Sequence, residues 1–200
     1  MNFVISPAGK YAMIILEIFE RMELYVMNGL THIYCGDGKG KTTAAVGLGV
    51  RACGSGKRVL MVQFLKGNSS SELIVLRQLK NFSVLPAPAS IKFTFQMTKR
   101  ELEETAVLCG NLFCKAVSAV NAGDCDLLIL DEVFGAVNCG LLDNGMLTDL
   151  IKNKPQNVEL VLTGRDPKPD VLELADYVSE IRKVKHPFDR DIPARRGIEF

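Results

Sequence analysis

This sequence of 200 residues lacks most of the features that mark a zinc centre, a secreted protein or a membrane protein. It has two histidines and no C-x-x-C pair among its six cysteines, so the spacing of a zinc site is absent. No apolar run approaches the roughly 20 residues of a membrane-spanning helix. The apolar stretch 12–16 is shorter than the about 7 to 15 residues of a secretory signal. We therefore expect a cytoplasmic protein with free thiols in reducing surroundings.

An excess of charge of either sign is also missing. The formal net charge is +1, so electrostatics give no reason to expect nucleic acid as the main partner. Hydrophobic residues make up 48% of the chain and charged residues 24%, which is typical of a globular protein. A chain of this length can bury the core of one domain of ordinary size.

The first part of the chain is set apart as an extension, residues 1–27, before a single domain, residues 28–200. Apolar side chains recur at helical spacing within residues 10–26, and Glu17, Glu20, Arg21 and Glu23 supply the polar side. This pattern predicts an amphipathic helix that lies on the domain and covers the site. The alternative is that Met27 is a real start and that the residues before it are dispensable.

From residue 30 onward, patterns typical of strands and of helices alternate. The strand-like runs are residues 30–35, 58–64, 82–86, 126–132, 158–164 and 176–183. The helical patterns are residues 41–53, 69–79, 98–120, 143–153 and 170–175, and capping boxes open those at Ser69-x-x-Glu72 and Thr98-x-x-Glu101. The central strands are apolar on both faces, which predicts an α/β fold with a mostly parallel sheet flanked by helices on both faces. We expect a P-loop NTPase fold of the RecA-like type.

A glycine-rich loop follows the first strand and opens the first helix. Gly40-Lys41-Thr42 matches the end of the phosphate-loop pattern G-x-x-x-x-G-K-[ST], but Cys35 stands where the first glycine is expected and Gly36 follows it. Glycines at alternate positions allow successive backbone N–H groups to point at anionic oxygens. The alternative is a glycine-rich turn that binds nothing.

Side chains around the loop add charge and a metal ligand. Lys41 supplies a full positive charge, Lys39 a second one, and the N-terminus of the following helix, which includes Thr43, a partial one. The Thr42 hydroxyl can bind Mg²⁺. We expect the carboxylate of Asp37 to point away from an anionic ligand.

Two carboxylates, Asp131 and Glu132, end the apolar strand of residues 126–132. This is the Walker B arrangement, in which one carboxylate reaches the metal and the other contacts ribose or a nucleophile. Ligands of parallel sheets bind at the carboxyl ends of the strands, where Gly36 and Gly164 also fall. The alternative is a pair of surface charges closing a strand.

The loop resembles that of one enzyme family when it is taken together with four further motifs. These are QFLKG at 63–67, DEVFGAVNCGLL at 131–142, LTGR at 162–165 and VKHPFDRDIPARRGIEF at 184–200. The combination is similar to the P-loop class of ATP:corrinoid adenosyltransferases of cobalamin synthesis and salvage. The resemblance runs from about residue 28 to Phe200.

The resemblance implies transfer of the 5′-deoxyadenosyl group of ATP to the Co(I) of a reduced corrinoid, with release of triphosphate. It also implies Mg²⁺ or Mn²⁺, a flavin-type electron donor protein, a homodimer, and a nucleotide bound in the reverse sense to ordinary P-loop enzymes. The implied catalytic residues are Lys41 and Glu132, and the implied metal ligands are Thr42, Asp131 and Glu132. The implied nucleotide- and corrinoid-binding residues are Gly36, Asp37, Gly38, Lys39, Gly40, Lys41, Thr42, Thr43, Arg51, Phe93, Phe95 and Arg165.

Aromatic residues are implied at the lower face of the corrin, where the family has a G-F-T-W motif. The matching stretch here is IKFTFQMT, and Phe95 stands at the tryptophan position of a chain that contains no tryptophan. The alternative places Phe93 and Phe95 in the core on one strand face. His186 is interpreted as a loop residue because an axial imidazole would oppose reduction of cobalt.

Two other functions are compatible with the motifs. One is a RecA-like P-loop ATPase or kinase, which would release phosphate or ADP. The other is a non-catalytic nucleotide-dependent switch that binds a protein partner. A basic cluster near the C-terminus fits a solvated basic tail, or contacts to triphosphate or to corrinoid side groups, better than it fits nucleic acid. Its members are Arg182, Lys183, Lys185, Arg190, Arg195 and Arg196.

Overall fold

The computed structural model describes residues 28–66, 70–86 and 94–199. Within the last range, only the backbone of Phe95 is described. The helix predicted for residues 10–26 lies outside these ranges. Six parallel strands form one sheet in the order β3-β2-β4-β5-β1-β6. The strands are β1 (Thr31–Cys35), β2 (Val59–Gln63), β3 (Phe82–Val84), β4 (Leu127–Asp131), β5 (Glu159–Thr163) and β6 (Tyr177–Glu180). Strand β5 separates β1 from β4.

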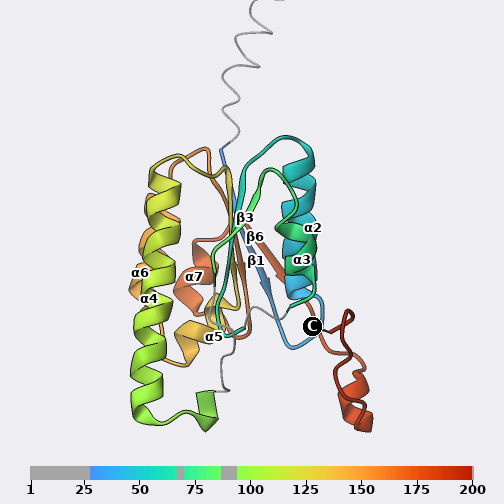
Figure 1. The fold of residues 1–200 in the computed structure, drawn as a ribbon. Helices are drawn as coiled ribbons and strands as arrows, with labels where there is room; N and C mark the ends of the chain where they lie inside the picture. The colour runs from blue at the N-terminus through green and yellow to red at the C-terminus, as the bar shows by residue number, and fades with distance from the viewer. Residues whose placement is uncertain (1–27, 67–69, 87–93, 200) are drawn as a thin grey trace, which may run out of the picture.

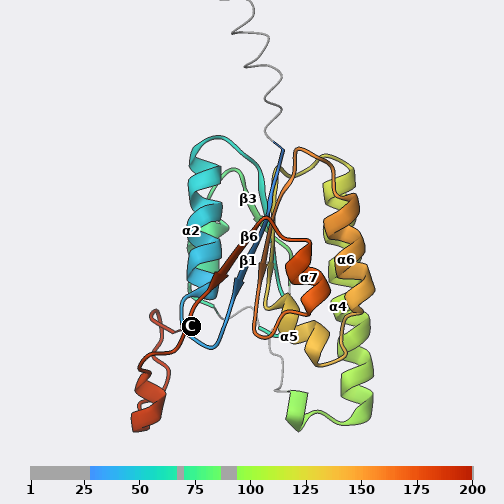
Figure 2. The same ribbon diagram turned by 180° about the vertical axis from the view of Figure 1, so that it is seen from behind.

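Helices cover both faces of this sheet (Figures 1 and 2). Helices α2 (Lys41–Gly54) and α3 (Glu72–Leu76) lie on one face. On the other face lie α4 (Lys99–Asn121), α5 (Val133–Asn138), α6 (Asn144–Asn153) and α7 (Pro169–Glu173). Two short 3₁₀ helices, η1 (Thr94–Gln96) and η2 (Pro187–Arg190), complete the described elements. The predicted α/β fold is confirmed.

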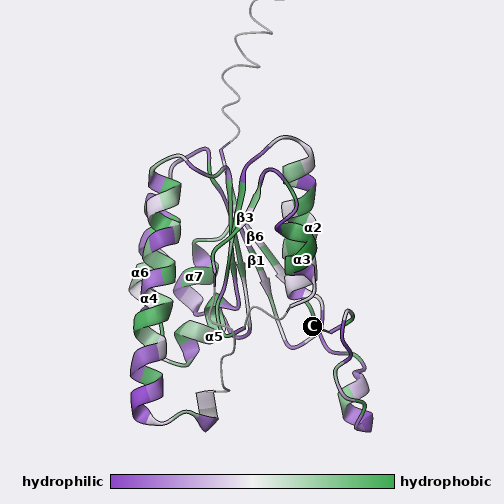
Figure 3. Ribbon diagram, viewed as in Figure 1, coloured by the Kyte–Doolittle hydropathy of each residue, from purple (hydrophilic) through white to green (hydrophobic). Residues whose placement is uncertain are grey.

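The core consists of two apolar layers, one on each face of the sheet. In β4, Leu128 and Leu130 pack toward the α4 side, whereas Leu127 and Ile129 pack toward the α2 side. Because successive strand residues point to opposite faces, a strand covered on both sides is apolar at every position. The hydropathy colouring in Figure 3 shows this apolar interior and the polar outer faces of the long helices.

Local sequence signals agree with most element boundaries but not with all of them. The capping box of Thr98 and Glu101 is present and starts α4. The predicted helix 69–79 was wrong in its limits: α3 spans only Glu72–Leu76, and Ser71 is its N-cap. Ser69 lies outside the described residues. Helix α5 was not predicted, because its six residues directly follow the carboxylate motif and are too few to show a helical period.

Strand β6 lies at the edge of the sheet, next to β1, and its four residues are all exposed. Beyond it the chain leaves the sheet and returns past the carboxyl end of β1 (Figure 1, red). All six cysteines are free. Among the described residues, no helix combines the length and the apolarity needed to cross a bilayer.

Candidate functional site

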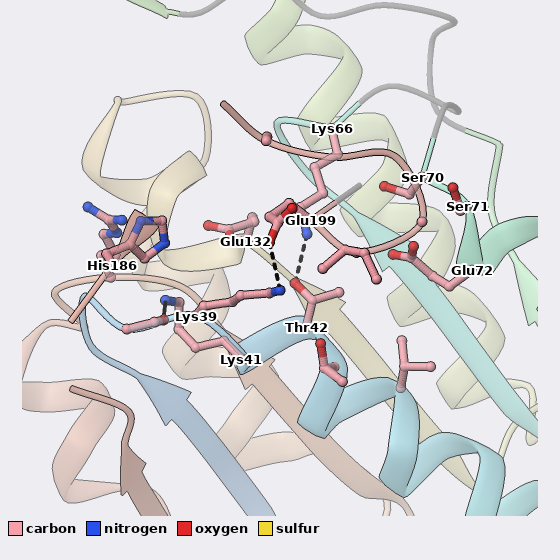
Figure 4. Close-up of a pocket in the computed structure, with 18 of the residues that line it drawn as sticks. Lys39, Lys41, Thr42, Lys66, Ser70, Ser71, Glu72, Glu132, His186 and Glu199 are labelled. Atoms are coloured by element: carbon pink, nitrogen blue, oxygen red, sulfur yellow. Dashed lines mark hydrogen bonds and ion pairs between the residues drawn. The ribbon is translucent and has the colours of Figure 1, made fainter. Parts of the chain in front are cut away.

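A cavity of about 810 Å³ opens at the carboxyl ends of the strands, where the glycine loop joins β1 to α2 (Figure 4). The whole loop segment 37–43 lines it on one side. Glu132, which directly follows β4, and Lys66, which lies beyond the end of β2, line another side. The C-terminal residues 194 and 197–199 close it. Segments far apart in the sequence thus meet in one cavity.

The position of Gly36 has a structural reason. Cys35 is the last residue of β1 and is buried in the core, so the chain turns one residue later, at Gly36, with φ +103°. A Cβ atom on Gly36 would lie 2.5 Å from the carbonyl oxygen of Ile181, the residue that follows β6. Only glycine fits this backbone conformation and this close approach.

Three consecutive loop residues are bonded to the C-terminal part of the chain. The backbone N–H of Gly38 donates to the Ile181 carbonyl (2.7 Å), and the Lys183 N–H donates to Asp37 Oδ1 (2.8 Å). This N–H group holds the pKa of Asp37 below its usual value. The Asp37 carboxylate is therefore directed at the backbone after β6, as expected of a carboxylate turned away from an anionic ligand.

The third link is an ion pair between Lys39 and Glu199, with Lys39 Nζ 3.1 Å from Glu199 Oε1 (Figure 4). Glu199 also accepts hydrogen bonds from the guanidinium and the backbone N–H of Arg195. Chiefly because of Arg195, the pKa of Glu199 falls to about 2. Glu199 therefore stays ionised, and the G-I-E-F segment contacts the loop through a full charge.

Lys41 is the first residue of α2 and is only 7% exposed. Its Nζ donates to the carbonyl oxygen of Gly38 across the loop, at 2.8 Å. Burial lowers the pKa of Lys41, and the nearby carboxylate of Glu132 opposes this shift. An anionic ligand in the loop would gain from both the ammonium and the N-terminus of the helix.

Asp131 is completely buried, and its carboxylate accepts four hydrogen bonds. Oδ1 accepts from the Thr42 hydroxyl (2.9 Å) and the Thr163 hydroxyl (2.6 Å). Oδ2 accepts from the Gln63 amide (3.2 Å) and from Lys66 Nζ (2.9 Å). These contacts connect the phosphate loop directly to the end of β4.

Glu132 adopts a left-handed backbone conformation, with φ 59°, just after β4. Its N–H donates to the Thr163 hydroxyl (2.9 Å), and its side chain lines the cavity. A non-glycine residue in this conformation costs about 1–3 kcal/mol. Burial, and then the neighbouring charge of Asp131, raise the pKa of Glu132. Strain and desolvation thus meet at one carboxylate that faces the cavity, which is typical of functional sites.

The structure brings most of the predicted site residues together. The loop residues 37–43, Glu132 and Arg165 all line the cavity, and Asp131 is hydrogen-bonded to Thr42.

Other predicted residues lie elsewhere. Arg51 does not line the cavity, since it occupies the last turn of α2, at the far end of the helix from the loop. Phe93 lies outside the described residues. The backbone of Phe95 belongs to η1, not to a strand. His186 accepts from the N–H of Phe188 and so caps η2.

Four contributing residues were not predicted from the sequence. Lys66 and Gln63 belong to the motif QFLKG, Thr163 belongs to LTGR, and Glu199 belongs to G-I-E-F. The motifs were noted, but nothing local in them indicates which side chain meets Asp131 or Lys39. A lysine, a glutamine and a threonine at the carboxyl ends of buried strands were the available signal.

Several oxygen atoms at the site suit a hard divalent cation. The Thr42 hydroxyl and the carboxylates of Asp131 and Glu132 are ligands of the kind that Mg²⁺ prefers. The described part of the chain holds no group of three or more His, Cys, Asp or Glu residues that could bind a metal by itself. A Mg²⁺ site built on one or two carboxylates and on substrate phosphates needs no such group.

Comparison with known proteins agrees with this geometry. The sequence model of the family described as ATP:corrinoid adenosyltransferase BtuR/CobO/CobP matches residues 27–200. A corrinoid adenosyltransferase of Escherichia coli K12 is 35% identical over 175 residues, which are 86% of each chain. The corrinoid adenosyltransferase CobA of Salmonella typhimurium LT2 is 34% identical over the same length and coverage. The chain belongs to the ATP:corrinoid adenosyltransferase family.

Proposed function

We propose that the cavity binds ATP by its triphosphate and directs the ribose C5′ toward the Co(I) of a reduced corrinoid. The cobalt electron pair forms the Co–C5′ bond, the C5′–O5′ bond breaks, and its electron pair leaves on triphosphate. One observation supports this proposal above all. The loop 37–43 and the segment 197–199 belong to the first and the last of the motifs along the chain, and both line the same cavity. A ligand held by the loop is therefore also beside the C-terminal segment.

The proposed role of the loop differs from that in a kinase. A kinase must leave the terminal phosphorus open to attack, whereas here the phosphorus atoms do not react and the whole triphosphate is the leaving group. Lys41, the loop N–H groups and Lys39 surround the growing negative charge. Fixed charges of this kind, in a partly buried site, stabilise the transition state more than they stabilise ATP. Arg165, which also lines the cavity, adds to this set.

Mg²⁺ is part of the proposal, with Thr42, Asp131 and Glu132 as the residues that would hold it and Mn²⁺ as a substitute. Bound there, the ion would supply positive charge to the triphosphate oxygens. Thr42 and Asp131 are already hydrogen-bonded to each other (2.9 Å), which keeps two of these groups close together. Glu132 extends into the cavity from the same end of β4 and completes the set.

The proposed partners are a corrinoid, a flavin-type electron donor protein that reduces it, and a second copy of the chain in a homodimer. We place the reaction in the cytoplasm, where six free cysteines would stay reduced.

The central experiment combines the protein with Mg-ATP, cob(I)alamin and a strong reductant under anaerobic conditions. We expect a light-sensitive Co–C bond, detected by absorbance, and inorganic triphosphate, detected by ³¹P NMR. Binding of ATP without formation of this bond would rule out the proposed reaction. Release of phosphate or ADP would instead identify a RecA-like ATPase or kinase. Nucleotide-dependent binding of a protein, without corrinoid binding, would identify a switch.

Replacing Phe95 by alanine should hinder formation of four-coordinate Co(II). The proposal assigns Phe95 to the lower face of the corrin, where an aromatic ring keeps axial ligands away and makes reduction of cobalt easier. EPR of bound cob(II)alamin in the presence of Mg-ATP measures the four-coordinate species directly. Phe95→Trp, which restores the residue of the family motif, is the matched control and should retain or increase the signal. An unchanged spectrum in the alanine variant would return Phe95 to a packing role.

A further inference from the structure

The ammonium group of Lys66 lies on two of the proposed metal ligands. Its Nζ is 2.7 Å from Thr42 Oγ1 (Figure 4) and 2.9 Å from Asp131 Oδ2. A cation of the chain itself therefore bridges the hydroxyl of the phosphate loop and the carboxylate at the end of β4. These oxygens belong to the set that a divalent cation at this site would use.

The carboxylate of Asp131 has no hydrogen-bonding capacity left for a further partner. A carboxylate has about four lone-pair positions, and Thr42, Thr163, Gln63 and Lys66 each donate to one. A divalent cation that binds Asp131 must therefore replace one of these donors.

Lys66 is the donor that can leave. Gln63 and Thr163 are the last residues of the buried strands β2 and β5 and are 2% and 0% exposed. The Lys66 side chain is 30% exposed, lies beyond the end of β2 and carries its charge on a flexible four-carbon stem. It also lines the cavity, so a small rotation moves its ammonium toward a ligand bound at the loop.

The charges favour this exchange only when an anion is present. A fully buried carboxylate needs a compensating charge, and the ammonium of Lys66 provides one for Asp131. A divalent cation that arrives alone must displace that ammonium into a cavity where Lys41 and Arg165 already place positive charge. A polyphosphate in the cavity attracts the displaced ammonium and offsets this repulsion.

We propose that Lys66 and the divalent cation compete for Asp131 and Thr42; this inference rests on the metal site of the proposed function. This competition makes metal binding dependent on the nucleotide. Lys66 bridges the two ligand residues until polyphosphate and metal arrive together, and its ammonium then pairs with the triphosphate. By linkage, the factor by which ATP tightens metal binding equals the factor by which the metal tightens ATP binding.

The test uses Mn²⁺ as an EPR-visible probe, titrated with and without ATP into the wild-type protein and Lys66→Met. Without ATP, the variant should bind Mn²⁺ about tenfold more tightly than the wild type, within the range usual for couplings between sites. The factor by which ATP tightens Mn²⁺ binding should fall correspondingly. Lys66→Gln, which keeps a hydrogen-bond donor but no charge, should shift affinity in the same direction and serves if Lys66→Met fails to fold. Lys152→Met, on the exposed side of α6, is the matched control and should leave both affinities unchanged.

The outcomes separate this inference from the function on which it rests. Equal Mn²⁺ affinity of the wild type and both Lys66 variants without ATP, with ATP-dependent binding intact, overturns the competition alone. Failure of the wild type to bind Mn²⁺ even with ATP overturns the metal site itself. Weaker Mn²⁺ binding in the variants would show that Lys66 supports the metal instead of competing with it, and this also overturns the inference.

Discussion

Replacing Lys41 by alanine should lower turnover by about 10²–10³-fold, the loss typical of removing one preorganised group that stabilises developing charge. Lys41 is buried at the N-terminus of α2, and its ammonium lies inside the loop, 2.8 Å from the Gly38 carbonyl. The charge that it faces grows as the C5′–O5′ bond breaks, so kcat should fall more than the affinity for ATP. Corrinoid affinity should stay close to the wild-type value.

Single-turnover kinetics and a corrinoid binding titration measure the two effects separately. Lys39→Ala is the matched control, because its side chain is 46% exposed and is already paired with Glu199. Its loss should reduce turnover far less than the loss of Lys41. If Lys41→Ala weakened corrinoid binding as much as it slowed turnover, Lys41 could not have the role assigned to it.

Replacing Gly36 by alanine should destabilise the fold by at least about 2 kcal/mol and weaken ATP binding, because the positive φ and the close contact add to each other. The new Cβ would lie 2.5 Å from the Ile181 carbonyl oxygen, so the loop or the end of β6 must move. Either movement disturbs the hydrogen bond from Gly38 to Ile181, which positions the loop.

Chemical denaturation gives the free energy of unfolding, and calorimetric titration gives the ATP affinity. The matched control is Gly47→Ala, on the exposed side of α2, where a Cβ meets no atom within 4 Å. That change should stabilise the protein by about 0.5–1 kcal/mol, since alanine is the better helix former. A Gly36→Ala protein as stable as the wild type, with normal ATP affinity, would contradict the structural reason given for glycine at this position.

The elements that could be predicted from the sequence are those with strong local signals. The run 126–132 contains β4 (Leu127–Asp131) because a strand covered on both faces is apolar throughout. Helix α4 was predicted from its helical pattern and its capping box, and the structure confirms both. Helices α3 and α5 were misjudged or missed because five or six residues are too few to establish a helical period.

The same distinction holds for the candidate site: its contiguous motifs could be predicted, and its long-range contacts could not. The phosphate loop and the pair Asp131-Glu132 are contiguous motifs, and the structure joins them through one hydrogen bond from Thr42 to Asp131. Arg51 was assigned by resemblance, and the geometry of α2 carries it to the far end of the helix. Lys66 was overlooked because its partners are 24 and 65 residues away in the chain.

The sequence by itself therefore determined the α/β class, the anion-binding loop and the carboxylates at the end of β4, because periodicity, glycine spacing and strand ends act over a few residues. Only the tertiary structure decided that the segment after β6 bonds to Asp37 and Gly38 and that Lys66 reaches Asp131. Those contacts depend on strand order, which places β6 beside β1 and β2 beside β4. Strand order comes from packing the whole core, and no local pattern in the sequence encodes it.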